Sequence, residues 1–144
     1  MTVKQRCKKL IVAAGLLLSS LARSDVYVIV NAENSLNSMT AEGVERIFLK
    51  KAKRFENDLN AEPVALAEGS KQRTSFNKLV LQRDEQQLKY YWSRKMFSGG
   101  DRPPGMVNSE AEVVALVAQK QEAIGYVTTR PTDAHVKVVL QLKE

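Results

Sequence analysis

The sequence is almost without cysteine and histidine. Cys7 is the only cysteine and His135 the only histidine among 144 residues. Cys7 precedes an apolar run instead of following a lipobox, so it is not a lipid-attachment site. A single thiol and a single imidazole exclude an intramolecular disulfide, a thiolate metal cluster and a multi-histidine metal site. No metal or cofactor is therefore expected.

His135 lies at the start of the last predicted strand. No nucleophile-elbow motif accompanies it, so a histidine-based catalytic triad has no support beyond the histidine itself. A surface or edge-strand histidine is the favoured interpretation. The sequence therefore predicts a protein that is not an enzyme.

Long apolar runs are also lacking, and the one near the N-terminus has the pattern of a secretory signal. Leu10–Leu18 is an apolar run of about nine residues, far short of the roughly 20 that a membrane-spanning helix needs. Basic residues precede this run, and Ser20-Leu21-Ala22 places small residues at the two positions that a signal peptidase reads. We therefore expect residues 1–22 to be a cleaved signal peptide, with cleavage after Ser24 as the alternative, and residues 23–144 to be periplasmic.

The basic excess of the chain comes mainly from this N-terminal segment. The sequence holds 22 Lys and Arg residues against 16 Asp and Glu, a formal net charge of +6. Residues 1–22 contain four of the basic residues and no acid, which leaves 18 against 16, or +2, for residues 23–144. So small an excess is poor evidence for nucleic-acid binding, and no nucleic-acid partner is expected.

Residues 23–144, about 122 in all, suffice for one domain with one core. Strands alternate with helices along this segment, which predicts an α/β fold with a mixed sheet flanked by helices. Asp25–Asn31 is a nearly continuous β-branched run, typical of a strand buried on both faces. Further strands are predicted over 63–67, 123–127 and 136–140, and helices after four capping residues: Thr40, Ser70, Asp84 and Ser109.

The helix after Asp84 is expected to bury one stripe of side chains. The residues of that stripe recur at helical spacing: Leu88, Tyr91, Trp92 and Met96. Phe97–Gly105, with three Gly and two Pro, is predicted to form a loop. Tyr91, Trp92 and Phe97 are expected in the core or at its rim.

The segment Glu68–Phe76 runs from a predicted strand into a helix and carries the clearest signs of a ligand site. A helix N-terminus presents free N–H groups and partial positive charge, and Gly69 lets the backbone approach a ligand closely. The Ser70 hydroxyl can donate to an oxyanion, and Lys71 and Arg73 add positive charge. The alternative is that Ser70 only caps its own helix.

A second strand-to-helix junction, Asn31–Ser38, offers Asn34 and Ser35 as further donors. The alternative interpretation of this junction is an ordinary polar loop. We expect any anion to lie at the N-terminus of the helix that Ser70 opens, near the Asn34–Ser35 loop. The basic cluster within Lys50–Arg54 follows a helix C-terminus, where solvated cations are favoured over a ligand site.

Several segments, in order along the chain, resemble the periplasmic phosphate-binding proteins of ABC importers. The first strand and the helix through Arg46–Lys51 resemble the family's valine-rich strand and its helix ending in I-F-x-G-K. Pro63-Val64 and Glu68-Gly69-Ser70 resemble the next strand and its phosphate-contacting turn. Ala123–Val127 resembles the family's G-A-I-G-Y-V strand. The remaining matches, to a recurring region of small members, are Tyr91-Trp92, Phe97-Ser98-Gly99 and Arg102-Pro103-Pro104.

This resemblance implies a fold and a role. The fold is a single lobe of a type 2 periplasmic-binding-protein-like domain, whereas full-length members hold the anion between two lobes. The role is non-catalytic binding of phosphate or a similar small oxyanion, linked to uptake by an ABC importer. The match extends over essentially all of residues 23–144.

The phosphate-contacting turn departs from the family's R-x-x-G-S-G-T pattern. Two positions are kept, Gly69 and Ser70. The others differ: Leu66 stands at the arginine, Lys71 at the second glycine and Gln72 at the threonine. The resemblance therefore supports the fold more strongly than it supports the binding activity.

Two functions stay open at this point. The first is oxyanion binding, in which a half-site would bind more weakly than a two-lobed clamp and a homodimer could supply the missing wall. The second is an interaction module or sensory adaptor of the cell envelope that has kept the fold and lost the ligand.

The N-terminal pattern generates the first prediction. Cell fractionation followed by N-terminal sequencing should recover a periplasmic protein that begins at Arg23 or Asp25, because the peptidase reads the small residues before those positions. A cytoplasmic protein that still begins at Met1 would contradict the prediction.

Overall fold

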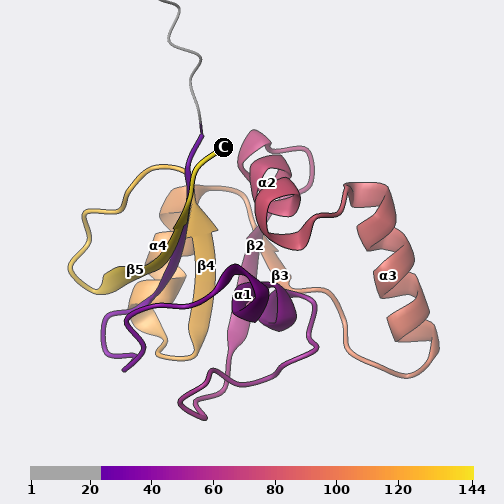
Figure 1. Cartoon of the computed structure of the whole chain (residues 1–144), viewed down its shortest axis with the longest axis horizontal. Helices are drawn as coiled ribbons and strands as arrows, with labels where there is room; N and C mark the ends of the chain where they lie inside the picture. Colours follow the sequence, from indigo (N-terminus) through magenta and orange to yellow (C-terminus); the bar gives the residue numbers. More distant parts are fainter. Residues whose placement is uncertain (1–23) are drawn as a thin grey trace, which may run out of the picture.

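The computed structural model describes residues 24–144, so the predicted signal peptide lies outside the described residues. None of the helices that these residues form has the length and apolar character needed to cross a membrane. The chain forms a five-stranded sheet with helices on both faces (Figure 1). The predicted α/β fold class is confirmed.

The sheet is mixed, with the strand order β3-β2-β4-β1-β5. β1 runs antiparallel to both of its neighbours, β4 and β5, whereas β2 runs parallel to β3 and β4. The strands are β1 (Val26–Asn31), β2 (Glu62–Leu66), β3 (Gly105–Val107), β4 (Ala123–Val127) and β5 (Val136–Leu142).

The helices begin where the capping residues predict. Thr40, Ser70, Asp84 and Ser109 each accept a hydrogen bond from the backbone of the first turn that follows. The helical elements are α1 (Ala41–Phe48), α2 (Lys71–Phe76), η1 (Asn77–Leu81), α3 (Glu85–Phe97) and α4 (Glu110–Gln119). η1 is a π-helical continuation of α2, and the turn after it has Gln82 in the left-handed conformation.

The alternation of side chains along β4 explains why this strand is apolar throughout. Tyr126 points to one face of the sheet, where its ring lies 3.8 Å from that of Phe76 and 5.8 Å from that of Phe48. Gly125 points to the other face, against Val113 and Val117 of α4. Both faces of the strand are therefore covered by helices, and all five of its residues are buried.

The structure corrects the predicted stripe of α3. Leu88 and Trp92 are buried, but Met96 is 49% exposed and Phe97 is 96% exposed. α3 lies at the edge of the molecule (Figure 1), so only the part of its stripe nearest the sheet meets the core. The expectation that Phe97 belongs to the core or its rim is wrong.

The predicted loop 97–105 also ends one residue too late. Gly105–Val107 pairs in parallel with Val64–Leu66 as the edge strand β3. Three residues are too few to show a period of two, and glycine is uncommon in strands. The pairing therefore has no signal in the local sequence.

The close approach of α4 to β4 depends on Gly125. A Cβ atom at this position would lie 2.5 Å from Val113 Cγ1, and Val113 is fully buried. We expect Gly125→Ala to lower the free energy of unfolding by about 1–3 kcal/mol, because the added methyl group overpacks the core. Urea denaturation measures this change.

Gly105→Ala is the matched control, since a Cβ atom there meets nothing within 4 Å. Its effect should stay within about 0.5 kcal/mol. Equal losses in the two variants would show that backbone preference, not contact with α4, sets the requirement for glycine at Gly125.

Candidate functional site

The Gly69–Ser70 turn joins the end of β2 to the start of α2. Gly69 has φ +86°, a conformation that glycine adopts at little cost. The Ser70 hydroxyl oxygen accepts a hydrogen bond from the Arg73 backbone N–H at 3.2 Å. Within residues 24–144, no hydrogen bond uses the N–H groups of Lys71 or Gln72, which are two of the free donors of the first helical turn. The turn therefore offers these two amides and a serine O–H to solvent.

The Arg73 side chain is held by the protein itself. Its Nε and Nη2 donate to the Glu85 carboxylate, with an Nη2–Oε2 distance of 3.0 Å. Its Nη1 donates to the Leu66 carbonyl oxygen at 2.9 Å and approaches Met106 Sδ at 3.4 Å. Only 13% of the Arg73 side chain is exposed. Four of the five guanidinium N–H groups are thus occupied.

Arg73 and Glu85 form an ion pair in which each charge stabilises the other. Burial acts to raise the pKa of Glu85, but the hydrogen bonds and charge of Arg73, with a hydrogen bond from Asn77, outweigh it and hold the pKa below its usual value. Asn77 Nδ2 donates to Glu85 Oε1 at 2.8 Å and is itself buried. Burial likewise opposes the charge of Arg73, and Glu85 outweighs it, so the pKa of Arg73 is raised.

Both backbone groups of Leu66, the last residue of β2, form hydrogen bonds with side chains. The Leu66 N–H donates to the Tyr126 hydroxyl at 3.0 Å, and the Leu66 carbonyl accepts from Arg73. Burial raises the pKa of Tyr126 to about 12, so the phenol stays neutral at physiological pH. The backbone position of the Gly69–Ser70 turn is therefore set by core residues.

The second predicted junction lies at the other end of the sheet. Asn31, at the end of β1, is next to the start of β4, because β1 and β4 are antiparallel. β2 is parallel to β4, so the turn after Leu66 lies at the opposite end. The expectation that one anion meets both Ser70 and the Asn34–Ser35 loop is therefore wrong. The physical reason is the direction of β1, which the sequence does not encode locally.

Asn34 and Ser35 serve their own loop. Asn57 Nδ2 donates to Asn34 Oδ1 at 3.0 Å and to Ser35 Oγ at 2.7 Å. The Asn34 carbonyl also accepts from the Lys137 ammonium group, which donates to Asn37 Oδ1 at 3.2 Å. These contacts match the ordinary polar loop that the sequence offered as the alternative.

His135 is a surface residue in the structure. The side chain of His135 is 79% exposed and its Nδ1 lies 3.0 Å from Asp133 Oδ1, as expected of a surface histidine. Residues 24–144 contain no group of three or more His, Cys, Asp or Glu side chains placed to hold a metal ion.

Sequence reasoning missed Glu85, which holds Arg73, and the two residues that support Glu85 and Leu66, namely Asn77 and Tyr126. Glu85 follows the N-cap Asp84. From the sequence it is only an acidic residue in the first turn of a helix, where acids are common. Asn77 and Tyr126 lie in a predicted helix and a predicted strand, where neither position signals a polar role. The contacts of these three residues with Arg73, Glu85 and Leu66 depend on how α2, α3 and β4 pack together.

Comparison with known proteins identifies the fold. No protein-family model and no curated protein sequence matches the chain. Among solved structures, it is similar to a phosphate ABC transporter substrate-binding protein with bound phosphate from Clostridium perfringens, with 17% identity, a TM-score of 0.65 and 81% of this chain covered. An ABC-type phosphate transport receptor from Vibrio cholerae gives 18% identity, a TM-score of 0.62 and the same coverage. The chain has a substrate-binding-protein fold.

PstS from Borrelia burgdorferi shares this fold at 16% identity, with a TM-score of 0.55 over 73% of the chain. The chain spans less than half the length of these proteins, namely 44%, 46% and 41% of them in the order given. At such identities the likeness concerns the substrate-binding-protein fold alone.

The Arg73–Glu85 pair generates a pH-dependent prediction. Folding lowers the pKa of Glu85, so its ionised form stabilises the folded state. This contribution to the free energy of unfolding is fully present above the unfolded-state pKa of about 4.3 and is lost as the pH falls through the folded-state pKa. We expect Glu85→Gln to lower the free energy of unfolding by about 1–3 kcal/mol at pH 7. The difference from wild type should shrink as the pH falls below about 4, as urea denaturation across pH would show.

Glu56→Gln is the control, since Glu56 is exposed and forms no ion pair within the described residues. Its difference from wild type should stay near zero at every pH. A Glu85→Gln difference that stays constant down to acidic pH would contradict the ion-pair account.

Proposed function

We propose that the chain is a non-catalytic solute-binding protein of the periplasm that binds phosphate or a similar oxyanion for an ABC-type importer. The substrate-binding-protein fold supports this role, since two of the similar proteins are described as phosphate transport proteins and one of these two holds phosphate. The observation that carries the proposal is the Gly69–Ser70 turn, where the Ser70 hydroxyl group precedes two backbone amides that have no acceptor within residues 24–144, at a helix N-terminus.

The anion would be bound by the backbone and by Ser70. The N–H groups of Lys71 and Gln72 would donate to two of its oxygens, and the Ser70 O–H to a third. The Lys71 side chain is exposed and would add positive charge beside the bound anion. Glu68, the nearest acid in sequence, lies 3.8 Å from the Lys89 ammonium group and is partly neutralised by it.

Arg73 has a different role from the one its position implies. Because Glu85, Leu66 and Met106 occupy four of its five N–H groups, Arg73 orients the turn and leaves one N–H for a ligand. It is therefore a positioning residue in this proposal. Asn34 and Ser35 are not part of the proposed site, because they lie at the other end of the sheet.

The turn is open to solvent, so the bound anion needs a second wall to be desolvated. A second copy of the chain or a partner protein would supply it. An open half-site has fewer converging donors than a closed cleft, so we expect weak binding.

Isothermal titration calorimetry of residues 23–144 with phosphate and with sulfate tests the proposal. Wild type should bind at least one of these anions. Ser70→Ala should weaken binding about 10- to 150-fold, because a hydrogen bond to a charged ligand contributes about 1.5–3 kcal/mol. Ser70→Thr, which keeps the hydroxyl group, should bind nearly as wild type does.

Lys53→Ala is the charge control, since Lys53 belongs to the basic cluster after α1 and its side chain is 71% exposed. This variant should leave binding almost unchanged. Oxyanion binding that Ser70→Ala does not weaken would refute the site. No binding of either anion by wild type would refute the function, and the ligand-free interaction module would take its place.

A further inference from the structure

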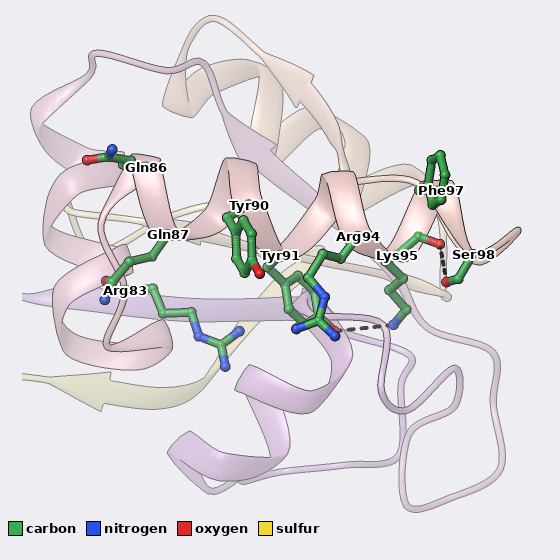
Figure 2. A pocket seen from close by; sticks show the side chains of 9 residues that line it. All are labelled: Arg83, Gln86, Gln87, Tyr90, Tyr91, Arg94, Lys95, Phe97 and Ser98. Atoms are coloured by element: carbon green, nitrogen blue, oxygen red, sulfur yellow. Dashed lines mark hydrogen bonds between the residues drawn. The ribbon is translucent and has the colours of Figure 1, made fainter.

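α3 carries a groove that the proposed anion site does not use. The groove has a volume of about 970 Å³ and opens along one side of the helix (Figure 2). Its central residues are Arg83, Gln87, Tyr90, Tyr91, Arg94 and Lys95, which we call the α3 groove. In Figure 2 the side chains of Tyr91, Arg94 and Lys95 lie together on this side, and Arg83 faces them from the segment before the helix.

The α3 groove has unbalanced positive charge. None of its lining residues is acidic. The Lys95 ammonium group is occupied, since it donates to the carbonyl oxygens of Leu49 and Lys50 at 2.9 and 3.0 Å and to the Tyr91 hydroxyl at 3.2 Å. Among residues 24–144, no hydrogen bond or ion pair uses the guanidinium of Arg83 or Arg94. The guanidinium of Arg94 and the part of the Arg83 guanidinium other than Nη1 are therefore available to a ligand.

Arg83 marks the base of the groove. Its guanidinium lies 4.9 Å from the centre of the Tyr91 ring, and its Nη1 atom is buried without a hydrogen-bond partner. A buried donor without a partner is destabilising, and an acceptor that reached it would remove this cost. Arg94 lies 5.7 Å from the centre of the Tyr90 ring, closer to solvent.

Tyr91 packs against the core, but the core does not explain Tyr90. Tyr90 is 65% exposed, whereas Leu88 and Trp92, on the buried side of α3, belong to the core. Exposed tyrosine and arginine side by side are typical of protein interfaces, where both are enriched. Their presence in one groove points to a macromolecular partner.

We propose that the α3 groove docks an acidic segment of a partner protein. Carboxylates of this segment would pair with the guanidinium groups of Arg83 and Arg94, which match carboxylates in a planar, two-bonded geometry. An apolar or aromatic side chain of the segment would lie against Tyr90 and Tyr91. The recessed position of Arg83 favours a narrow segment over a flat, anionic membrane surface, which meets only exposed cations.

A synthetic copolymer of glutamate and tyrosine serves as the probe, with phosphatidylglycerol vesicles as the comparison. Binding to residues 23–144 is measured by calorimetry, and the fluorescence of Trp92, the only tryptophan, reports on α3. Wild type should bind the copolymer. Arg83→Gln combined with Arg94→Gln should weaken binding by about 10-fold or more, as expected for loss of two charged hydrogen-bonding groups.

A matched control removes the same charge elsewhere. The control is Lys120→Gln combined with Lys143→Gln, because both lysines lie outside the groove. This variant should change the affinity for the copolymer by less than about 3-fold, since only long-range attraction is lost. Tyr90→Ala changes no charge and removes an exposed ring, so it should fold normally and still weaken copolymer binding several-fold. All these variants should keep the oxyanion binding of wild type, which separates this proposal from the proposed function.

Three results would overturn the proposal. One is equal weakening by the arginine pair and the lysine pair, which would show binding to net charge. Another is copolymer binding that is unchanged both in Tyr90→Ala and in the double arginine variant. The third is binding of wild type to vesicles but not to the copolymer, which would make the α3 groove a membrane contact.

Discussion

The guanidinium of Arg73 joins the parts of the molecule on which the proposed site depends. It bonds the last carbonyl of β2 through Leu66 and the first turn of α3 through Glu85, while its own helix begins at Ser70. A largely buried cation of this kind is tolerated only where its donors are satisfied. The turn, α2 and α3 are therefore held in one arrangement, and the cost of burying Arg73 is offset by Glu85 and Asn77.

This arrangement changes what the turn can offer an anion. A free arginine would supply a full positive charge, but here Glu85 neutralises it, and the remaining attraction comes from two amides, one hydroxyl group and the exposed Lys71. Backbone donors fixed by the core are well oriented before the ligand arrives. In the proposed site, geometry would therefore contribute more to binding than charge. The chain spans less than half the length of the substrate-binding proteins whose fold it shares.

Much of the fold could be predicted because its signals are local. Thr40, Ser70, Asp84 and Ser109 mark the starts of helices through contacts within one turn, and the β-branched run before Asn31 needs only its own composition to indicate a buried strand. Strand direction and tertiary pairing are not local. The sequence therefore indicated Ser70 as a donor, yet it could not show that Asn34 lies at the far end of the sheet, that Glu85 occupies Arg73, or that Phe97 is left in solvent.

The proposed function requires the backbone amides that follow the Gly69–Ser70 turn to bind an oxyanion. The most direct measurement is a titration of isotope-labelled residues 23–144 with phosphate, followed by NMR of the backbone amides. The account predicts that the N–H signals of Lys71 and Gln72 shift most and saturate, while those of Asn34 and Ser35 stay in place. Saturable shifts at the Asn34–Ser35 loop without shifts at Lys71 and Gln72 would contradict it.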